Sequence, residues 1–529
     1  MSDDLPSSYD VVVVGTGLVE SIVAAAAARI GKQVLHIDKN KYYGQHWATF
    51  NYDDVQQWVG DKGEAPSPTH DPVDNLQFLA TEESRRLVSD ISQDWFGGVI
   101  TKPKEPPKKS EAAAEGDAKA DSTDEAPVTE TLTADDTKAK LASLSRKFNI
   151  DLAPKLLFFK GPMVDVLIKS QVSRYLEFLG VQNILLCVNG VIELVPCSKS
   201  DVFSTRTVTI VEKRLLMKLL TTLQSYKDDS EELKELENST FEDYLKQQNI
   251  SETVQHYILY SIAMATQETT AAQGIKQAQA FLNSIGFCGN TPFIWPMYGT
   301  SEILQAFCRL SAVYGGIYCL NRNADFLVNV ENGPCEGVYS NGGILKAQNV
   351  VVSTGLVPSC YVNRESPSEC YQRAVLITNK AVFPGGKEGI SLLTYPFLDS
   401  SFDPITLLEL NSNTSSCPKG FFVVHLVSRK GKQKTPYEDF DKLIADIFSP
   451  SGEGDKPTIL YKLLFTVDII SSTQVSDLPA NVHSCSGPRC LSIDFHSSLQ
   501  EAETIFKRMF PDDEFLPTPE AVEEVASEE

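Results

Sequence analysis

The sequence predicts an α/β fold combined with a smaller part that is entirely helical. Three observations predict this. A short apolar strand, a glycine turn and an alanine-rich helix open the chain at residues 9–29. From Lys155 to Phe287 apolar residues recur mainly at helical spacing, and short strand patterns return after Pro292. With 529 residues, the chain also exceeds the length at which a single hydrophobic core stops growing.

The amino-terminal region predicts a β-α-β unit of the dinucleotide-binding type. Residues 9–14 form a continuous apolar run, followed by Gly15-Thr16-Gly17 and a helix that extends to Arg29. A second apolar run, residues 33–37, ends at Asp38, where dinucleotide-binding proteins place the acid that holds the ribose.

The third glycine of the dinucleotide fingerprint is replaced by Glu20. A glutamate is bulky where strand and helix must pack closely, and its charge competes for the helix end that binds the diphosphate. Two like charges about 4 Å apart repel by roughly 4 kcal/mol at an effective dielectric of 20. We therefore predict no bound cofactor, with Gly15, Gly17, Glu20 and Asp38 as vestiges of the site. A nucleotide site that tolerates Glu20 stays open as an alternative.

No catalytic motif replaces the lost site. A P-loop, a Gly-x-Ser-x-Gly turn and metal-ligand spacing are all absent from the sequence. The histidines, for example His36, His46 and His425, stand alone, and His36 is better explained as a hydrogen-bonded core residue than as a base. We expect a protein that is not an enzyme and holds no metal.

Composition restricts the partners and the compartment. The chain has 47 basic and 70 acidic residues, a formal charge of −23, which disfavours nucleic acids and electrostatic attachment to membranes. The eleven cysteines lack metal or redox spacing, so we expect reduced thiols in the cytoplasm. No secretory leader, membrane span or prenylation box is recognisable, so any lipid that the protein handles is not its own.

The pattern changes along the chain predict the following order of segments. We expect the first part of the α/β domain I over 1–100 and a disordered acidic insertion over 101–140, although the carboxyl end of the insertion could alternatively be a charged helix. The helical domain II should begin over 141–180, be interrupted by return strands of domain I over 181–210 with a hairpin at Asn189-Gly190, and continue over 211–290. The second part of domain I should follow over 291–510, and an acidic tail over 511–529.

Two blocks of sequence resemble a known superfamily. The chain is similar, in these blocks, to the Rab GDP-dissociation inhibitors and Rab escort proteins, and the resemblance extends over nearly the whole chain apart from the insertion and the tail. The blocks are the turn Gly15 to Ser21 with Val34 to Asp38 and Tyr42-Tyr43-Gly44, and the stretch Tyr298 to Glu302 that continues through Arg309 to Ala312–Tyr318.

Other segments resemble the escort branch more closely than the inhibitors, and the charged insertion points the same way. These segments are Asn149–Leu152, Ile168–Ser170, Val195–Ser198 with Asp201–Phe203, and Val211–Lys218. A recycling Rab GDP-dissociation inhibitor is the first alternative, and a flavin-dependent oxidoreductase is the second.

The resemblance implies a flavoprotein-like, multi-sheet domain I without flavin and a smaller helical domain II. It implies a carrier that binds newly made, GDP-bound Rab GTPases, presents their C-terminal cysteines to the Rab geranylgeranyltransferase heterodimer, and shields the geranylgeranyl lipid during delivery to a membrane. Such a protein is an accessory component of the transferase and performs none of its chemistry.

The resemblance also implies sites. Rab binding would use Tyr43, Glu302 and Arg309, although an internal salt bridge between the last two is an alternative. Transferase binding would use Phe281 at the far end of domain II, where family members carry a phenylalanine and a basic residue. Phe281 could equally be core, and Phe287 stands where escort proteins commonly have an arginine. The lipid could lie along 211–223 and Val164, Leu167 and Ile168, which ordinary helical packing also explains.

Overall fold

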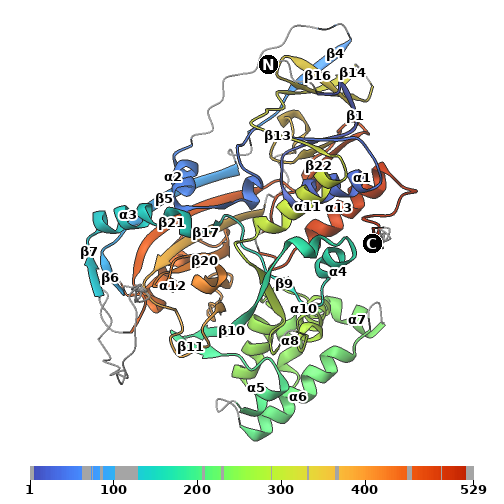
Figure 1. The fold of residues 1–529 in the computed structure, drawn as a ribbon. Coiled ribbons are helices and arrows are strands. Elements are labelled where there is room, and N and C mark those ends of the chain that lie inside the picture. Colours follow the sequence, from blue (N-terminus) through green and yellow to red (C-terminus); the bar gives the residue numbers. More distant parts are fainter. Residues whose placement is uncertain are drawn as a thin grey trace, which may run out of the picture.

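Two large sheets and a group of helices make up the protein (Figure 1). In this view the helices between residues 199 and 284 gather at the lower end, away from the strands at the top. The structure, a computed structural model, describes residues 5–61, 73, 75–83, 87–101, 129–204, 209–227, 231–287, 289–330, 333–363, 369–449, 455–489 and 491–519.

The first sheet has eight strands and contains the predicted β-α-β unit. β1 (Ser8–Val14) lies between β2 (Val34–Asp38) and β16 (Gly343–Ser353), and the three strands are parallel. Valines fill β1 because both of its faces are covered. The other strands of this sheet are β4 (Leu76–Ala80), β13 (Ile317–Leu320), β14 (Phe326–Val330), β15 (Cys335–Ser340) and β22 (Val482–Cys485).

Helix α1 (Leu18–Arg29) joins β1 to β2 and is buried on all sides. It packs in one cluster with α11 (Ser301–Val313) and α13 (His496–Met509). The run of alanines follows from this position, because only small side chains fit where a helix is enclosed between a sheet and two other helices.

The second sheet has ten strands and is mainly antiparallel. Its centre consists of the pairs β17–β20 and β17–β21 and is largely buried; the register of β17–β21 shifts once, between Ile377 and Thr378. The strands are β5 (Val88–Trp95), β9 (Leu157–Phe158), β10 (Phe178–Val188), β11 (Val191–Leu194), β12 (Phe293–Pro296), β17 (Glu369–Thr378), β18 (Ile390–Tyr395), β19 (Ile405–Leu410), β20 (Phe422–Arg429) and β21 (Ile459–Ile469). Two small sheets pair β3 (Thr49–Phe50) with β8 (Ile150–Asp151), and β6 (Gly98–Thr101) with β7 (Thr129–Leu132).

The helical part has its own apolar core, which also covers one end of the second sheet. Helix α6 (Ile210–Ser225) packs Leu216, Leu219, Leu220 and Leu223 into this core, as its spacing predicts, whereas Val211, which has the same spacing, is 65% exposed. Gly274 is needed in α10 because a Cβ there would come within 2.3 Å of the Phe241 ring. The helices of this part are α5 (Lys199–Ser204), α6, α7 (Glu231–Glu235), α8 (Phe241–Lys246), α9 (Glu252–His256), a π-helix (Tyr257–Ile262) and α10 (Ala271–Ser284).

The remaining helices are distributed around the two sheets. They are α2 (Tyr52–Gly60), α3 (Ala134–Ser143), α4 (Pro162–Lys169) and α12 (Glu438–Ile447), with short 3-10 turns that include Gln45–Trp47 and Val172–Tyr175.

The predicted hairpin at Asn189-Gly190 is confirmed. β10 and β11 form the expected hairpin, in which Val188 pairs with Val191 and the turn residues Asn189 and Gly190 have φ angles of 51° and 76°. Positive φ at both positions is the geometry that Asn-Gly favours in a two-residue turn.

Other boundaries differ from the predicted ones. Residues 102–128 of the expected insertion lie outside the described residues. Within the described part, Thr129–Leu132 form β7 and α3 begins at Ala134, so the end of the expected insertion is strand and helix. A capping box formed by Thr133 and Asp136 begins α3, which agrees with the alternative of a charged helix.

Residues 141–180 do not belong to the helical core alone. Met163 and Leu167 of α4 pack in the cluster of α1 and α13, on the side of the first sheet. Residues 199–204 are helix α5 and not a return strand. The predicted frayed tail is wrong for 511–519, because Phe515 and Leu516 are buried against Phe506 of α13.

Candidate functional site

The predicted glycine turn connects β1 to α1 at the carboxyl edge of the first sheet. Gly15 has a φ of 99°, and helix α1 begins directly after Gly17. This is the position at which a dinucleotide-binding protein holds the diphosphate, against the helix amides.

Side chains of the protein fill the space above both glycines. An oxygen of Glu20 lies 2.4 Å from the position that a Cβ would take on Gly17, and Nε2 of Gln45 lies 2.5 Å from the corresponding position on Gly15. Glu20 is 2% exposed and Gln45 is 6% exposed. The residues of this turn therefore do not fit the diphosphate of a dinucleotide.

The structure corrects the electrostatic part of the sequence argument. Burial raises the pKa of Glu20 to about 8, against the opposing effect of its own amide, and its Oε2 has no hydrogen-bond partner. The carboxyl group is therefore mainly protonated at neutral pH. It obstructs the diphosphate position by its volume and not by a full negative charge.

The side chains of Asp38 and His36 both form hydrogen bonds with residues of the glycine turn. Asp38 Oδ2 accepts hydrogen bonds from the amide and hydroxyl of Thr16, at 2.9 and 2.7 Å, and its Oδ1 accepts two from Asn40. Nε2 of His36 lies 2.5 Å from the carbonyl oxygen of Gly15, and burial lowers the pKa of this histidine to about 4. His36 is a neutral core residue, as predicted.

Tyr43 is held beside the turn and near α11. The amide of its neighbour Gly44 donates to Thr16 Oγ1 at 2.9 Å, and its ring lies 6.2 Å from the ring of Tyr318. Cys308 of α11 is close enough to Tyr43 to contribute to its raised pKa, although burial is the larger cause. The structure thus brings Tyr43 to the helix that carries the other two predicted Rab-binding residues.

Glu302 and Arg309 do not pair with each other. The guanidinium carbon of Arg309 lies 4.3 Å from the centre of the Tyr175 ring, and Arg309 is exposed. Glu302 is half-buried, and within the described part of the chain its carboxylate has neither a hydrogen bond nor an ion pair. Burial raises its pKa. The predicted alternative of a bracing salt bridge is therefore wrong.

The amino-terminal end of α11 is fixed by a residue that sequence reasoning missed. Asp151 is fully buried, and its Oδ1 accepts hydrogen bonds from the amide of Thr300 and the hydroxyl of Thr49, both at 2.7 Å. The hydroxyl of Thr49 also accepts a hydrogen bond from the Ser301 amide at 3.2 Å. Asp151 therefore satisfies the Thr300 amide directly and supports the Thr49 hydroxyl that satisfies the Ser301 amide, and both amides would otherwise lack partners at the helix end. Local sequence gave no sign of this pairing, because Asp151 and Thr300 are 149 residues apart.

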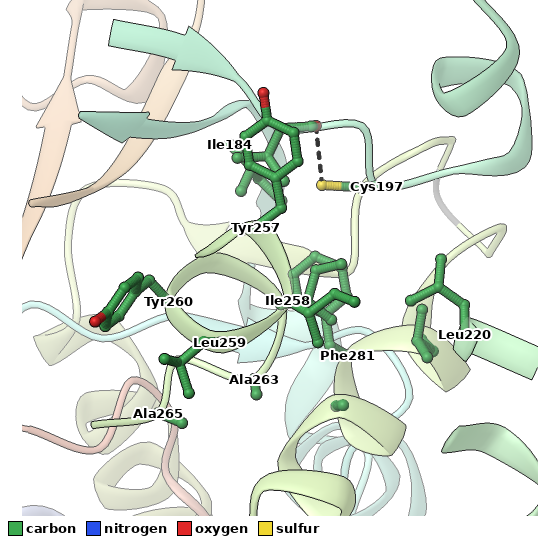
Figure 2. Close-up of a cluster of buried hydrophobic side chains, with 14 of the residues drawn as sticks. Ile184, Cys197, Leu220, Tyr257, Ile258, Leu259, Tyr260, Ala263, Ala265 and Phe281 are labelled. Atoms are coloured by element: carbon green, nitrogen blue, oxygen red, sulfur yellow. Dashed lines mark hydrogen bonds between the residues drawn. The ribbon is translucent and has the colours of Figure 1, made fainter. Parts of the chain in front are cut away.

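Phe281 is not the surface residue that the resemblance suggested. It is fully buried in the helical core, 5.6 Å from the Phe293 ring in a T-shaped contact. Figure 2 shows it beside Ile258 and near Leu220, among the other buried side chains. A side chain in this position cannot contact a second protein, so the alternative of a core residue is correct.

Phe287 is the exposed phenylalanine of this region. It is 58% exposed, its ring stacks on Phe159 at 5.8 Å, and the Nζ of Lys160 lies 5.7 Å from its centre. An exposed aromatic ring and a basic side chain therefore lie together here, with the basic side chain supplied from a distant part of the sequence.

The suggested lipid-lining residues divide into two groups. Leu167 packs in the core beside α13, and the inward leucines of α6 pack in the helical core. Ile168 and Val211 are 62% and 65% exposed. None of the helices in the described residues is both long and apolar enough to cross a membrane. In the same residues, no group of three or more histidine, cysteine or acidic side chains is arranged to hold a metal.

The fold defines the class first: the chain is built on the scaffold of dinucleotide-binding flavoproteins. An oxidoreductase from Methanosarcina mazei superimposes with a TM-score of 0.54 at 11% identity, covering 94% of this chain and 99% of its own. The Rab GDI of Plasmodium falciparum superimposes with a TM-score of 0.65 at 18% identity, covering 96% and 99%. These similarities show the fold alone.

Sequence comparison then gives the family. The family model described as GDP dissociation inhibitor matches residues 3–71 and 118–436, more than half of the chain. The chain belongs to this family. Rab proteins geranylgeranyltransferase component A 1 of Rattus norvegicus is 32% identical over 99% of this chain and 94% of its own length. Component A 2 of Mus musculus is 33% identical over 100% of both chains. The Rab GDP-dissociation inhibitor of Saccharomyces cerevisiae is 25% identical over 86% of this chain and 90% of its own.

Proposed function

We propose that this protein is a Rab escort protein, the accessory component A of Rab geranylgeranyltransferase. It binds unprenylated, GDP-bound Rab, presents the C-terminal cysteines to the transferase heterodimer, and shields the attached lipid until a membrane receives it. The observation that carries this proposal is similarity along the full length to proteins named component A, at 32–34% identity, against 25% for the yeast inhibitor.

The Rab-binding surface is formed by Tyr43 and the exposed side of α11. Glu302 supports this role because a half-buried carboxylate without a partner is costly unless a binding partner provides a donor. Arg309 is exposed and held in place by the Tyr175 ring, so little side-chain entropy is lost when a partner binds it.

The transferase-binding surface contains Phe287 and Lys160 in place of Phe281. The stacking of Phe159 on Phe287 fixes an exposed aromatic ring, and the lysine provides the adjacent positive charge. Rigid aromatic rings with a nearby charge are common at the centre of protein interfaces.

We also propose that this protein catalyses no reaction of its own. It is supported by the side chains of Glu20 and Gln45, which occupy the space above the two glycines. The alternative function is that of a flavin enzyme. Absorbance at about 450 nm from a flavin bound to the purified protein would establish this alternative. We further propose a cytosolic location, in keeping with the free thiols of the nine described cysteines.

Reconstituted prenylation tests the proposal. Unprenylated Rab, the transferase and labelled geranylgeranyl diphosphate are combined with and without this protein, and lipid incorporation into Rab is measured. We expect incorporation only when the protein is present. Incorporation at background, together with extraction of prenylated Rab from membranes, would instead identify a recycling inhibitor.

A further inference from the structure

The three most exposed large hydrophobic side chains of the described residues lie within nine positions of one another. Ile210 is 72% exposed, Phe203 is 71% exposed and Val211 is 65% exposed. Phe203 lies near the end of α5, and Ile210 and Val211 begin α6. We call these three residues the apolar tip.

Hydrogen bonds hold the two sides of the apolar tip together. Nζ of Lys213 donates to the carbonyl oxygen of Phe203 at 2.8 Å, which joins α6 to the end of α5. A capping box between Thr209 and Glu212 fixes the first turn of α6. Figure 1 shows α5 and α6 at the lowest end of the molecule, away from α11 and the first sheet. The three side chains of the apolar tip therefore lie at the far end of the helical part, with α5 and α6 linked through Lys213.

The same face of α6 is basic. Arg214 and Lys218 follow Val211 by three and seven residues, which places them on one side of the helix. Both are exposed and have no ion pair in the part of the chain that the structure describes. Residues 199–204 and 209–218 together contain four basic and two acidic residues, in a chain whose net charge is −23.

We propose that the apolar tip, with Arg214 and Lys218, is a surface that inserts into the interface of a membrane containing anionic lipids. Exposed apolar side chains that protrude beside lysine and arginine have the chemistry of peripheral membrane anchors, which bury the apolar atoms among the lipid headgroups and place the cations near the phosphates. The acidic residues elsewhere do not prevent this, because charges more than about 8 Å away are largely screened at physiological salt. This inference goes beyond the escort function and can hold without it, since the tip itself would recognise the bilayer.

Vesicle flotation with the full chain tests the proposal. We expect the protein to float with vesicles of phosphatidylcholine that contain about 30 mol% phosphatidylserine, and much less with phosphatidylcholine alone. The triple variant Phe203→Ser, Ile210→Ser, Val211→Ser should lose binding to both. Arg214→Glu with Lys218→Glu should lower binding to the anionic vesicles about thirtyfold or more and abolish its salt dependence.

Matched controls separate the tip from general surface effects. Val191→Ser with Leu194→Ser removes side chains of β11 that are 59% and 49% exposed. Lys419→Glu with Lys434→Glu makes the same change of charge at distant exposed sites. Both control variants should float like the unmodified chain, and circular dichroism should show the same thermal transition for every variant.

Two results would overturn the proposal. One is an unmodified chain that stays in solution with anionic vesicles at low salt, and the other is a tip variant that floats as well as the controls. If the tip variant binds vesicles normally but fails to support prenylation in a vesicle-free reaction, the tip serves a protein partner and the proposal is wrong. Failure of the unmodified chain in that reaction, with flotation intact, counts against the escort function only.

Discussion

The guanidinium of Arg309 lies 4.3 Å from the centre of the Tyr175 ring, and it does not reach Glu302 seven residues earlier on the same helix. This contact decides between two explanations that the sequence left open. Because the arginine and the glutamate are not paired, both remain available to a partner.

Replacing Arg309 with alanine should weaken Rab binding with little loss of stability. An exposed cation–π contact contributes about 0.5–1 kcal/mol, whereas an arginine at the centre of an interface often contributes about 2 kcal/mol, or roughly thirtyfold in affinity. Titration calorimetry with GDP-bound Rab measures the loss of affinity, and thermal unfolding measures the change in stability. Arg174→Ala, a neighbouring exposed arginine, is the control. A large drop in melting temperature for Arg309→Ala would show that the residue mainly braces the fold.

The Glu20→Gln variant should be more stable than the unmodified protein at pH 8 but not at pH 4.5. The pKa of Glu20 is raised from 4.5 to about 8 in the folded protein, so between these values the unfolded chain releases a proton that the folded chain keeps. Stability therefore falls as pH rises through this window, by an amount on the order of a few kcal/mol, and glutamine does not titrate. Denaturant unfolding at the two pH values measures the difference. A variant that is equally destabilised at both would argue against a protonated Glu20.

Asp151→Ala should weaken both folding and Rab binding, because the Thr300 amide at the start of α11 loses its acceptor and the Thr49 hydroxyl, which accepts from the Ser301 amide, loses the group that holds it. Loss of a cap typically costs about 1 kcal/mol. Asp151→Asn keeps an oxygen that accepts from Thr300 and should recover most of both properties. Chemical unfolding and Rab titration of the two variants provide the comparison, and equal Rab affinity for alanine and asparagine would exclude a positioning role.

Alanine substitutions of Phe281 and Phe287 should affect different properties, the first mainly stability and the second mainly transferase binding. Phe281→Ala removes a buried ring and should destabilise the protein by about 3–5 kcal/mol. Phe287→Ala removes an exposed ring and should change stability little, but it should reduce binding of the transferase to the complex of this protein with Rab. Lys160→Ala should reduce it further. Sedimentation of the ternary complex, with denaturant unfolding of each variant, measures both effects; unchanged transferase binding in Phe287→Ala would remove this residue from the proposed surface.

Deletion of residues 105–125 should be tolerated, because their composition cannot support a packed core. Deletion of 105–135 should not be tolerated, since it removes β7 with its buried Leu132 and the Thr133 cap of α3. Yield of soluble protein and thermal unfolding distinguish the two deletions. Normal folding of the longer deletion would show that β7 and the start of α3 are dispensable.

Sequence by itself determined the features that depend on neighbouring residues. The β-α-β unit, the Asn189-Gly190 hairpin and the inward leucines of α6 all follow from local spacing and backbone preference, and the structure has each of them. The substitution at Glu20 was also visible locally, because it breaks a motif of six residues.

Only the tertiary structure decided which side chains are buried and which distant groups meet. Gln45 lies over Gly15, Asp151 holds Thr300, and Lys160 approaches Phe287, and none of these pairs is predictable from spacing along the chain. The ionisation of Glu20 depends on the same burial, because the free energy of a charge is set by the groups and the water around it and not by its position in a motif.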